Sequence, residues 1–342
     1  MYNASLCLPP ENSHLDHENQ TPYAQLDPNA ILDAIESTGF ICTGSLIALN
    51  SYENRVYQIG LENAEPLIAK FYRPNRWSSA AILEEHQFSL ELAQHEIPII
   101  APLMIKDQTL HHHHEFRFAL FPRRGGHALE LDNSEQLEWM GRFLGRLHRV
   151  GACQTFKHRI QLDVQNYGHD PYNFLIDQNF IPDYLVTNFC NTVERVIHKI
   201  KQVFEAIGNV SSLRLHGDCH AGNVLWSESG PHIVDLDDCL MGPAIQDIWM
   251  LLSGETDQMN LQLDKILQGY CEFHDFKPHE RHLIEPLRTL RMLHYSGWLA
   301  KRWNDPAFPV SFPWFNTPVY WQNLLVNLIE QEELLDQIEP LV

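Results

Sequence analysis

Two acidic residues and one asparagine near the middle of the chain have the types and spacing that phosphate chemistry needs. Residues 215–226 read Leu-His-Gly-Asp-Cys-His-Ala-Gly-Asn-Val-Leu-Trp, and residues 233–238 read Ile-Val-Asp-Leu-Asp-Asp. An aspartate such as Asp218 can accept the proton of a hydroxyl group. Asn223 offers a neutral oxygen to Mg²⁺, and Asp235 can bridge the same metal to phosphate oxygens. These three residues are the candidates for a phosphoryl-transfer site.

The spacing of the three residues strengthens this interpretation. Asp218 and Asn223 are five residues apart, the spacing between the base aspartate and the metal-binding asparagine in the catalytic loop of protein kinases. Asp235 comes twelve residues after Asn223, where the second metal-binding carboxylate belongs. We therefore predict catalytic roles for Asp218 and Asp235, and a Mg²⁺ site at Asn223 and Asp235.

Two metal-based alternatives use the same segment. Asp218 and His220 also match the Asp-x-His start of a metallophosphoesterase, but that class needs further Gly-Asp and Gly-Asn-His motifs, which the downstream sequence lacks. A zinc site at Cys219 and His220 lacks suitably spaced partners. Both alternatives rank well behind phosphoryl transfer.

The elements that must position these residues divide the chain into a β-rich first third and a helical remainder. A polar tail over 1–25 precedes a helix capped by Asp27, opened by Pro28 and stopped by Gly39. Residues 111–114, four histidines, are expected to form an exposed hairpin tip. The remaining patterns predict strands over 40–49, 55–61, 66–72, 101–106 and 116–121, and a helix over 78–95.

The character of the sequence changes after residues 122–126. A helix is expected to end at Gly151, another spans about 185–206, and helices continue from residue 245 to an aromatic-rich end that we expect to pack in the core. Short strands interrupt the helices over 214–238. The predicted fold is α+β, with a small N-lobe over 26–122 and a larger C-lobe over 123–342 that enclose a cleft.

Composition limits the partners and the location of the protein. The 342 residues carry a net charge of −20, which disfavours nucleic acid and anionic membranes as partners. The amino terminus has no signal-peptide pattern, and no apolar run is long enough to span a bilayer. The seven scattered cysteines contain no CxxC pair, as in reduced cytoplasmic proteins. We therefore expect a cytoplasmic protein.

Several long motifs resemble those of a known family. The catalytic segment resembles the loop of the aminoglycoside phosphotransferase and choline kinase superfamily, whose fold is protein-kinase-like and bilobal. Residues 49–57 (Leu-Asn-Ser-Tyr-Glu-Asn-Arg-Val-Tyr), 82–88, 214–223, 242–249 and 302–309 are more specifically similar to the bacterial stress response kinase A family. The resemblance implies ATP as phosphate donor, and Ser or Thr of a protein as acceptor, including the enzyme itself, in a stress response.

The remaining kinase parts have candidates in the N-lobe. Lys70 lies mid-strand among apolar neighbours, as does the phosphate-binding lysine of kinases. Glu84 and Glu85 both qualify as its ion-pair partner from the helical pattern alone, and the family's spacing favours Glu85. The loop between the first two strands has no glycine, so Ser51 and Arg55 are the candidate phosphate contacts.

Two further roles follow from the resemblance to kinases, and two alternatives to a protein kinase stay open. The strand over 116–121 and Pro122 would form the hinge that meets the adenine, and Asp247 would brace the catalytic loop from a buried position. A small-molecule kinase acting on an amino alcohol, sugar or antibiotic is the alternative enzyme. A nucleotide-binding module without catalysis is the other, which the intact set of Lys70, Asp218, Asn223 and Asp235 disfavours. The sequence does not indicate an oligomeric state.

Overall fold

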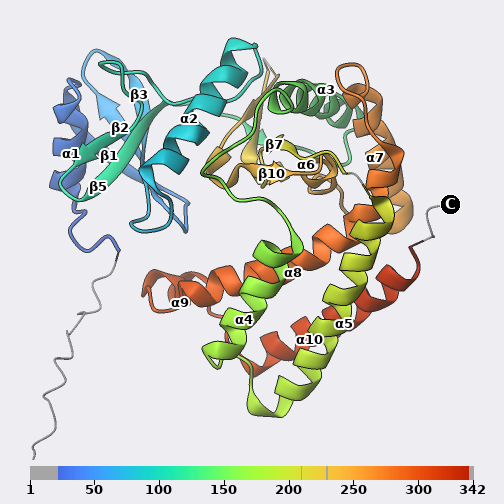
Figure 1. Cartoon of the computed structure of the whole chain (residues 1–342). Helices are drawn as coiled ribbons and strands as arrows, with labels where there is room; N and C mark the ends of the chain where they lie inside the picture. Colours follow the sequence, from blue (N-terminus) through green and yellow to red (C-terminus); the bar gives the residue numbers. More distant parts are fainter. Residues whose placement is uncertain (1–21, 209, 229, 339–342) are drawn as a thin grey trace, which may run out of the picture.

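A five-stranded antiparallel sheet extends through the N-lobe, from β1 near its start to β5 at its end. The computed structural model describes residues 22–208, 210–228 and 230–338 (Figure 1), so residues 1–21 of the predicted tail lie outside the described part. The strand order is β1-β2-β3-β5-β4. Their bounds are β1 (Cys42–Leu49), β2 (Arg55–Leu61), β3 (Ala64–Phe71), β4 (His111–His113) and β5 (Phe116–Pro122).

The helix α1 (Pro28–Ser37) covers one face of this sheet (Figure 1). The Asp27 side chain caps it by accepting a hydrogen bond of 2.8 Å from the backbone N–H of Ala30, as the sequence predicts. Its buried residues Ile31 and Ile35 pack with Leu67 and with the other apolar residues that face α1. This core fixes the sheet in orientation and leaves its opposite face free for the cleft.

The opposite face carries two rows of cross-strand neighbours. Residues paired directly across antiparallel strands point to the same face, so each row is a continuous strip. One row is Ile47, Gln58, Ile68 and Phe121, and the next is Leu49, Val56, Lys70 and Ala119. The second helix, α2 (Ser79–Gln94), corresponds to the helix predicted over 78–95, is capped by Ser78 and packs against this face through Ile82.

Two predictions about the segment after α2 are wrong. The strand expected over 101–106 is absent, and only an isolated bridge between Ile105 and Gln108 forms there. Pro98 and Pro102 lack the N–H that a central strand would need, and Ile99 pairs with Ile233 of the C-lobe instead. The predicted hairpin tip at 111–114 is not uniformly exposed either, because His111 is only 9% exposed and stacks against Phe118.

Helices build most of the C-lobe. α3 ends at Gly151 as predicted, and the long helix expected over 185–206 is α5. Most aromatic residues of the C-terminal part pack in a core between α5, α8 and α10, as predicted, whereas Trp314 is 44% exposed. The helices are α3 (Ser134–Gly151), α4 (Asp170–Asp177), α5 (Asp183–Ile207), α6 (Ile245–Trp249), α7 (Thr256–Tyr270), α8 (Ile284–Lys301), α9 (Ala307–Ser311) and α10 (Pro318–Asp336).

Two small sheets carry the catalytic segment. β7 (Leu213–Leu215) pairs with β10 (Leu240–Gly242), and β8 (Val224–Ser227) pairs with both β6 (His127–Ala128) and β9 (Gly230–Ile233). The backbone N–H of Ile100 donates to the carbonyl of Ile233, which ties the chain after α2 directly to β9. The catalytic segment is thereby anchored to both lobes.

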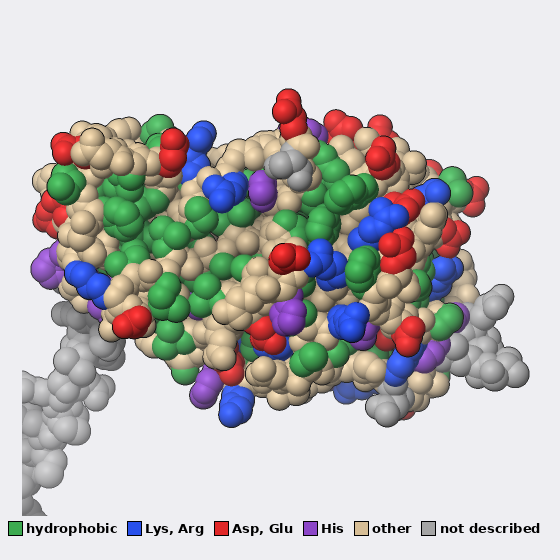
Figure 2. All heavy atoms as spheres, turned by 90° about the horizontal axis from the view of Figure 1, so that it is seen from above, with side chains coloured by type: hydrophobic (Ala, Val, Ile, Leu, Met, Phe, Trp, Pro, Cys, Tyr) green, Lys and Arg blue, Asp and Glu red, His purple; other side chains and the backbone are tan. Residues whose placement is uncertain are grey.

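The surface charges and the hydropathy of the helices bear on the possible partners of the described chain. On the face drawn in Figure 2, Lys and Arg side chains are interspersed with Asp and Glu and form no continuous basic patch. Within the described residues, no helix has the length and apolar character needed to cross a membrane.

Candidate active site

The backbone of the catalytic loop is held by a buried carboxylate. Asp247 of α6 accepts hydrogen bonds from the backbone N–H groups of His216 and Gly217, at 2.9 and 2.8 Å. Burial opposes ionisation of Asp247, but its hydrogen bond to His148 and these contacts outweigh it and lower the pKa of its carboxyl. Gly217 has φ +85°, and a Cβ there would lie 2.2 Å from the carbonyl oxygen of Asp238. Only glycine fits this turn.

Asp218 and Asn223 lie side by side on this loop. The Asn223 side-chain Nδ2 donates to the backbone carbonyl of Asp218 at 2.9 Å, so the amide oxygen is left for another ligand. The Asp218 carboxylate forms an ion pair with Arg291 of α8, with 2.8 Å between Nη2 and Oδ1. His220 lies 3.6 Å from its other oxygen. These two contacts fix the orientation of the Asp218 carboxylate.

Asp235 follows β9 in a left-handed conformation, with φ +61° and ψ +65°. Such a conformation costs about 1 kcal/mol or more for a residue with a side chain and is retained where its surroundings impose it. The neighbouring carbonyl of Val234 accepts a hydrogen bond from His216, which joins this turn to the catalytic loop. The half-exposed carboxylate of Asp235 accepts a hydrogen bond of 3.0 Å from Lys70.

Lys70 is the point where the two lobes meet electrostatically. Its buried ammonium lies 3.0 Å from Asp235, 3.1 Å from Asp237 and 3.6 Å from Glu85. Burial alone would lower the pKa of Lys70, but the three carboxylates raise it well above its ordinary value. The lysine therefore remains charged, as a phosphate-binding group must.

The two candidate glutamates of α2 point in different directions. Glu85 is buried and contacts Lys70, and its other oxygen lies 2.9 Å from Arg159. Glu84 instead accepts the backbone N–H groups of Lys157 and His158, both at 2.7 Å. The structure therefore brings Glu85, and not Glu84, to the lysine.

A second basic group reaches the same carboxylates. Arg76, in the loop between β3 and α2, forms ion pairs with Asp237 and Asp238. Burial opposes ionisation of Asp237, but Arg76, Lys70 and Arg159 outweigh it and hold the pKa of its carboxyl well below the usual range. Asp237 is thus an internal counter-ion for three cations of the cleft.

The loop between β1 and β2 is fastened to the C-lobe. Glu53 forms an ion pair with Arg302, with 2.5 Å between Oε2 and Nε, and accepts a hydrogen bond of 2.7 Å from the Trp298 indole. The next residue, Asn54, accepts the backbone N–H of Arg73 at 3.1 Å. The loop lacks glycine, and these side-chain contacts fix its backbone instead.

Of the two phosphate-contact candidates in this loop, the structure brings only Ser51 near the cleft entrance. Ser51 precedes Glu53 in the fastened loop and is half-buried. Arg55 pairs with Phe71 across the strands, on the face that α1 covers, and its guanidinium lies 4.5 Å from the ring centroid of Tyr23. The structure does not bring Arg55 to Lys70.

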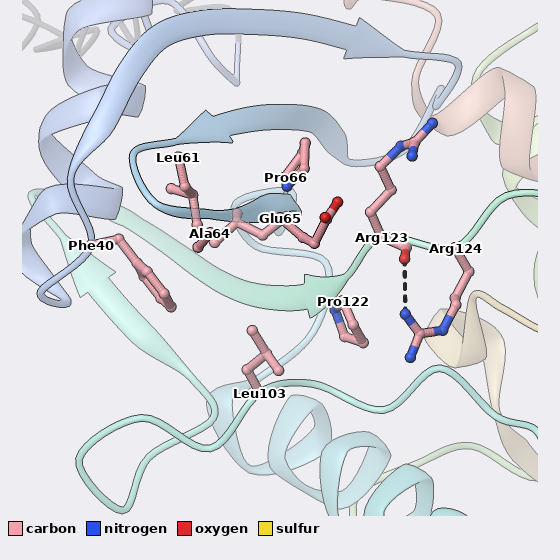
Figure 3. A pocket seen from close by; sticks show the side chains of 10 residues that line it. Phe40, Leu61, Ala64, Glu65, Pro66, Leu103, Pro122, Arg123 and Arg124 are labelled. Atoms are coloured by element: carbon pink, nitrogen blue, oxygen red, sulfur yellow. Dashed lines mark hydrogen bonds between the residues drawn. The ribbon is translucent and has the colours of Figure 1, made fainter.

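One cavity of the described chain lies away from this constellation. It measures about 400 Å³ and lies where β2 turns into β3, close to the Pro122 connector (Figure 3). Phe40, Leu61 and Leu103 converge on it, and all three contact the core on the α1 side of the sheet. It is therefore separated from Lys70 by the sheet itself. A second cavity of about 160 Å³ lies along α8.

The residues at the catalytic loop fit a magnesium ion. The free amide oxygen of Asn223 and the second carboxylate oxygen of Asp235 are hard oxygen ligands. In the described residues no cluster of three or more His, Cys, Asp or Glu side chains has a metal-binding arrangement. Mg²⁺ commonly binds one or two carboxylates of a protein and takes its further ligands from phosphates and water.

The fold and the site together define a phosphotransferase with a protein-kinase-like architecture. An amicoumacin kinase matches the structure with a TM-score of 0.70 over 92% of this chain and 96% of its own, at 19% identity. Choline kinase from Cryptosporidium parvum matches with a TM-score of 0.61 over 92% and 98%, at 13% identity. These likenesses concern the fold.

Sequence comparison is more specific. The model of the phosphotransferase enzyme family matches residues 45–284. Stress response kinase A of Escherichia coli K12 is 44% identical over 92% of this chain and 95% of its own length. The serine/threonine protein kinase RdoA of Salmonella typhimurium LT2 is 42% identical over 94% and 97%. The chain belongs to the phosphotransferase enzyme family, in the branch of the bacterial stress response kinase A proteins.

Several charged residues of the site were not among the sequence candidates. Arg291 and Arg302 come from the C-terminal helical part, far along the chain from their partners Asp218 and Glu53. Arg159 lies in an irregular segment without a recognisable pattern. One signal was available, since Glu53 and Arg302 both fall within motifs that resemble the family.

Proposed function

We propose that the protein is a Mg²⁺- and ATP-dependent Ser/Thr protein kinase that also phosphorylates itself and acts in a stress response. The contact of Lys70 with both Glu85 and Asp235 carries this proposal. A lysine paired to a helix glutamate and a metal-binding aspartate is the nucleotide clamp of kinases. The family membership and the printed activity of the Salmonella relative support a protein acceptor.

The cleft face of the sheet supports an adenine site. Ile47 and Leu49 are 51% and 39% exposed on that face, although they are apolar. Exposed apolar groups in a cleft favour a flat apolar ligand. Adenine would stack on the row formed by Ile47, Ile68 and Phe121, with the backbone after Phe121 available for its polar edge.

The phosphates would lie beyond this row, at Lys70. Lys70 would bind the phosphate oxygens, and Glu85 would hold the lysine in place. Ser51 would donate its hydroxyl from the fastened loop. Mg²⁺, held by Asn223 and Asp235, would supply the charge that neutralises the phosphates.

Asp218 would act on the acceptor. Its carboxylate would accept the proton of the acceptor hydroxyl as the oxygen attacks the terminal phosphorus. The contacts of Asp247 and Asn223 fix the backbone that carries it. Arg291 would keep the carboxylate oriented toward the C-lobe, where an acceptor side chain enters.

A small-molecule kinase is the alternative function. Choline kinase and an aminopropanol kinase, as their names state, act on amines, and both share the fold. The cavity along α8 is lined by Arg76, Arg302, Asp238 and Lys301, and Arg76 and Arg302 are already ion-paired. The ammonium of Lys301 would repel the ammonium group of an amine substrate, which favours a different acceptor.

Labelled ATP distinguishes these functions. The purified protein is incubated with Mg·ATP alone, with a bacterial protein pool and with a metabolite pool, and Asp218→Asn serves as the inactive control. We expect label on Ser or Thr of the protein itself and in the protein pool. Label confined to metabolites would establish the small-molecule function, and absence of transfer from wild type would leave only nucleotide binding. The predicted cytoplasmic location is tested separately by cell fractionation.

A further inference from the structure

The cavity along α8 begins about one helical turn from Arg291, the residue that pairs with Asp218. Arg291 contacts Asp218, and His294, three residues later on the same helix, lines the cavity and stacks on Tyr167 with 4.0 Å between ring centroids. Lys301, at the last position of α8, lines its far end. Asp238 lines it too, three residues after Asp235. The cavity is therefore a continuation of the catalytic cleft toward the acceptor side.

The cations that line this cavity differ in whether they have an ion-pair partner among the described residues. Arg76 is paired with Asp237 and Asp238, and Arg302 is paired with Glu53. Among the described residues, no carboxylate comes within 4.0 Å of the Lys301 ammonium, which lies instead 5.6 Å from the ring centroid of Phe174. Lys301 is thus the cation of the lining without an ion-pair partner.

The surroundings of Lys301 favour an incoming anion. Partial burial and the neighbouring Arg302 lower the pKa of Lys301, whereas Asp170 raises it. Asp170 is engaged with Gln165 at 2.6 Å and does not neutralise the lysine. Burial also lowers the pKa of His294 to about 3, so its ring is neutral and adds no charge. Lys301 is exposed, so an anionic group placed here would gain an ion pair at no cost to an existing one.

We propose that the cavity is an acceptor subsite in which Lys301 binds a carboxylate or phosphate on the polypeptide that presents the phosphorylated hydroxyl. This inference rests on the proposed protein kinase function and adds the substrate class. A carboxylate would come from Asp or Glu, and a phosphate from a residue phosphorylated earlier. Trp298 and Tyr167 would contact the apolar part of the same side chain.

The helix sets the distance between the two ends of the subsite. Lys301 follows Arg291 by ten residues in α8, which corresponds to about 15 Å along the helix axis. An extended peptide covers about 3.3 Å per residue. The anionic side chain would therefore lie about four residues from the acceptor Ser or Thr.

Short fluorescent peptides test the subsite without relying on catalysis. Each carries one serine and, about four residues away on either side, Glu, phosphoserine, Ala or Lys, and its affinity is measured in the presence of Mg·ADP. We expect the Glu or phosphoserine peptide to bind about fivefold more tightly than the Ala peptide, as for a partly exposed ion pair. Comparison of these two peptides distinguishes a carboxylate from a phosphate ligand.

Substitutions of Lys301, the last residue of α8, complete the test. Lys301→Ala should abolish the preference, Lys301→Glu should reverse it in favour of the Lys peptide, and Lys265→Ala, an exposed lysine of α7, should retain it. Equal affinities of all peptides for wild type, or an unchanged preference in Lys301→Ala, would overturn the subsite. Autophosphorylation with labelled ATP, followed in parallel, tests the proposed kinase function separately, since it does not depend on Lys301 selecting a peptide.

Discussion

Glu53 and Arg302 form an ion pair across the cleft, with 2.5 Å between Oε2 and Nε, and thereby join the phosphate loop of the N-lobe to the end of α8. Glu53 is 9% exposed, and Trp298 donates to the same oxygen. Kinase loops of the glycine-rich type approach phosphates because they lack side chains. Here the loop instead takes its shape from a buried carboxylate that cannot move without breaking these contacts.

Glu53→Gln should therefore loosen the loop. It leaves Arg302 without its counter-ion in a buried position, which costs about 3 kcal/mol of stability. We expect the KM for ATP to rise about tenfold, with a smaller change in kcat, because ground-state contacts to the phosphates are lost. Glu62→Gln, on the exposed turn after β2, is the matched control. An unchanged KM for ATP in a destabilised Glu53→Gln would limit Glu53 to a purely structural role.

The two glutamates of α2 should respond differently to substitution. Lys70→Ala should reduce kcat/KM about 10²-fold, as for loss of one electrostatic donor to the transferred group. Glu85→Ala should do milder damage by releasing the lysine. Glu84→Ala should leave the affinity for ATP unchanged, because its contacts are with the 157–158 backbone. If Glu84→Ala lowered the affinity for ATP and Glu85→Ala had no effect, the assignment of Glu85 as the partner of Lys70 would be wrong.

The two catalytic aspartates should fail in different ways. Asp218→Asn removes the proton acceptor, for a loss of about 10²–10⁴ in rate, while Mg·ATP still stabilises the protein thermally. Asp235→Asn removes a hard anionic ligand, so the Mg²⁺ requirement should rise and the stabilisation by Mg·ATP should shrink. Metal titrations read by thermal shift and by transfer measure both. The reverse pattern, with metal lost in Asp218→Asn and kept in Asp235→Asn, would contradict these roles.

The buried Asp237 predicts a pH dependence of stability. Its pKa is lowered in the folded state by Arg76, Lys70 and Arg159, which overcome the effect of burial. A carboxyl with a lowered folded pKa stabilises the fold above its unfolded pKa of about 3.9, and this contribution is lost as the pH falls toward the folded value. The difference in Tm between wild type and Asp237→Asn should be large at neutral pH and should shrink below about pH 4. A difference that stays constant with pH would assign the loss to packing.

The segment after Asp235 predicts activity without prior phosphorylation. Residues 236–246 contain a 3₁₀ turn at Leu236–Asp238 and the strand β10, paired with β7. A segment this short and this ordered has no long loop for a phosphate to reorganise. Protein treated with phosphatase and checked by mass spectrometry should still bind Mg·ATP and turn over. Loss of activity with a removed phosphate mapped to 236–246 would disprove this.

Much of the local structure could be predicted from the sequence, since its signals are local. Asp27 and Pro28 mark the start of α1, and alternating apolar residues mark β2. The prediction of a strand over 101–106 was wrong because Pro102, and Pro98 just before the run, lack the N–H that a strand ladder needs. Ile99 finds a strand partner about 130 residues away, at Ile233, and no local pattern encodes such a pairing.

The residues of the candidate site also differ in how far the sequence could predict them. Asp218, Asn223 and Asp235 lie within one short stretch, so their types and spacing mark them as candidates in the sequence alone. The counter-ion Arg291 was not identifiable, because an exposed helix arginine and an active-site arginine look alike in one sequence, and Arg302 was marked only by its place in a motif that resembles the family. Arg55 is the opposite case, a candidate from the sequence that the structure does not bring to Lys70. Its neighbour Val56 shares the cleft face with Lys70, and the alternation of a strand turns Arg55 to the other side.

The helix α8 contacts three parts of the candidate site. Arg291 pairs with Asp218, Trp298 donates to Glu53 of the β1–β2 loop, and Lys301 lines the second cavity. Under the proposed function, nucleotide and acceptor would both bind beside contacts of this one helix, so a shift of α8 on binding of one would change the contacts of the other. Thermodynamic reciprocity then requires that any factor by which ATP changes the affinity for the acceptor be returned, unchanged, in the affinity for ATP.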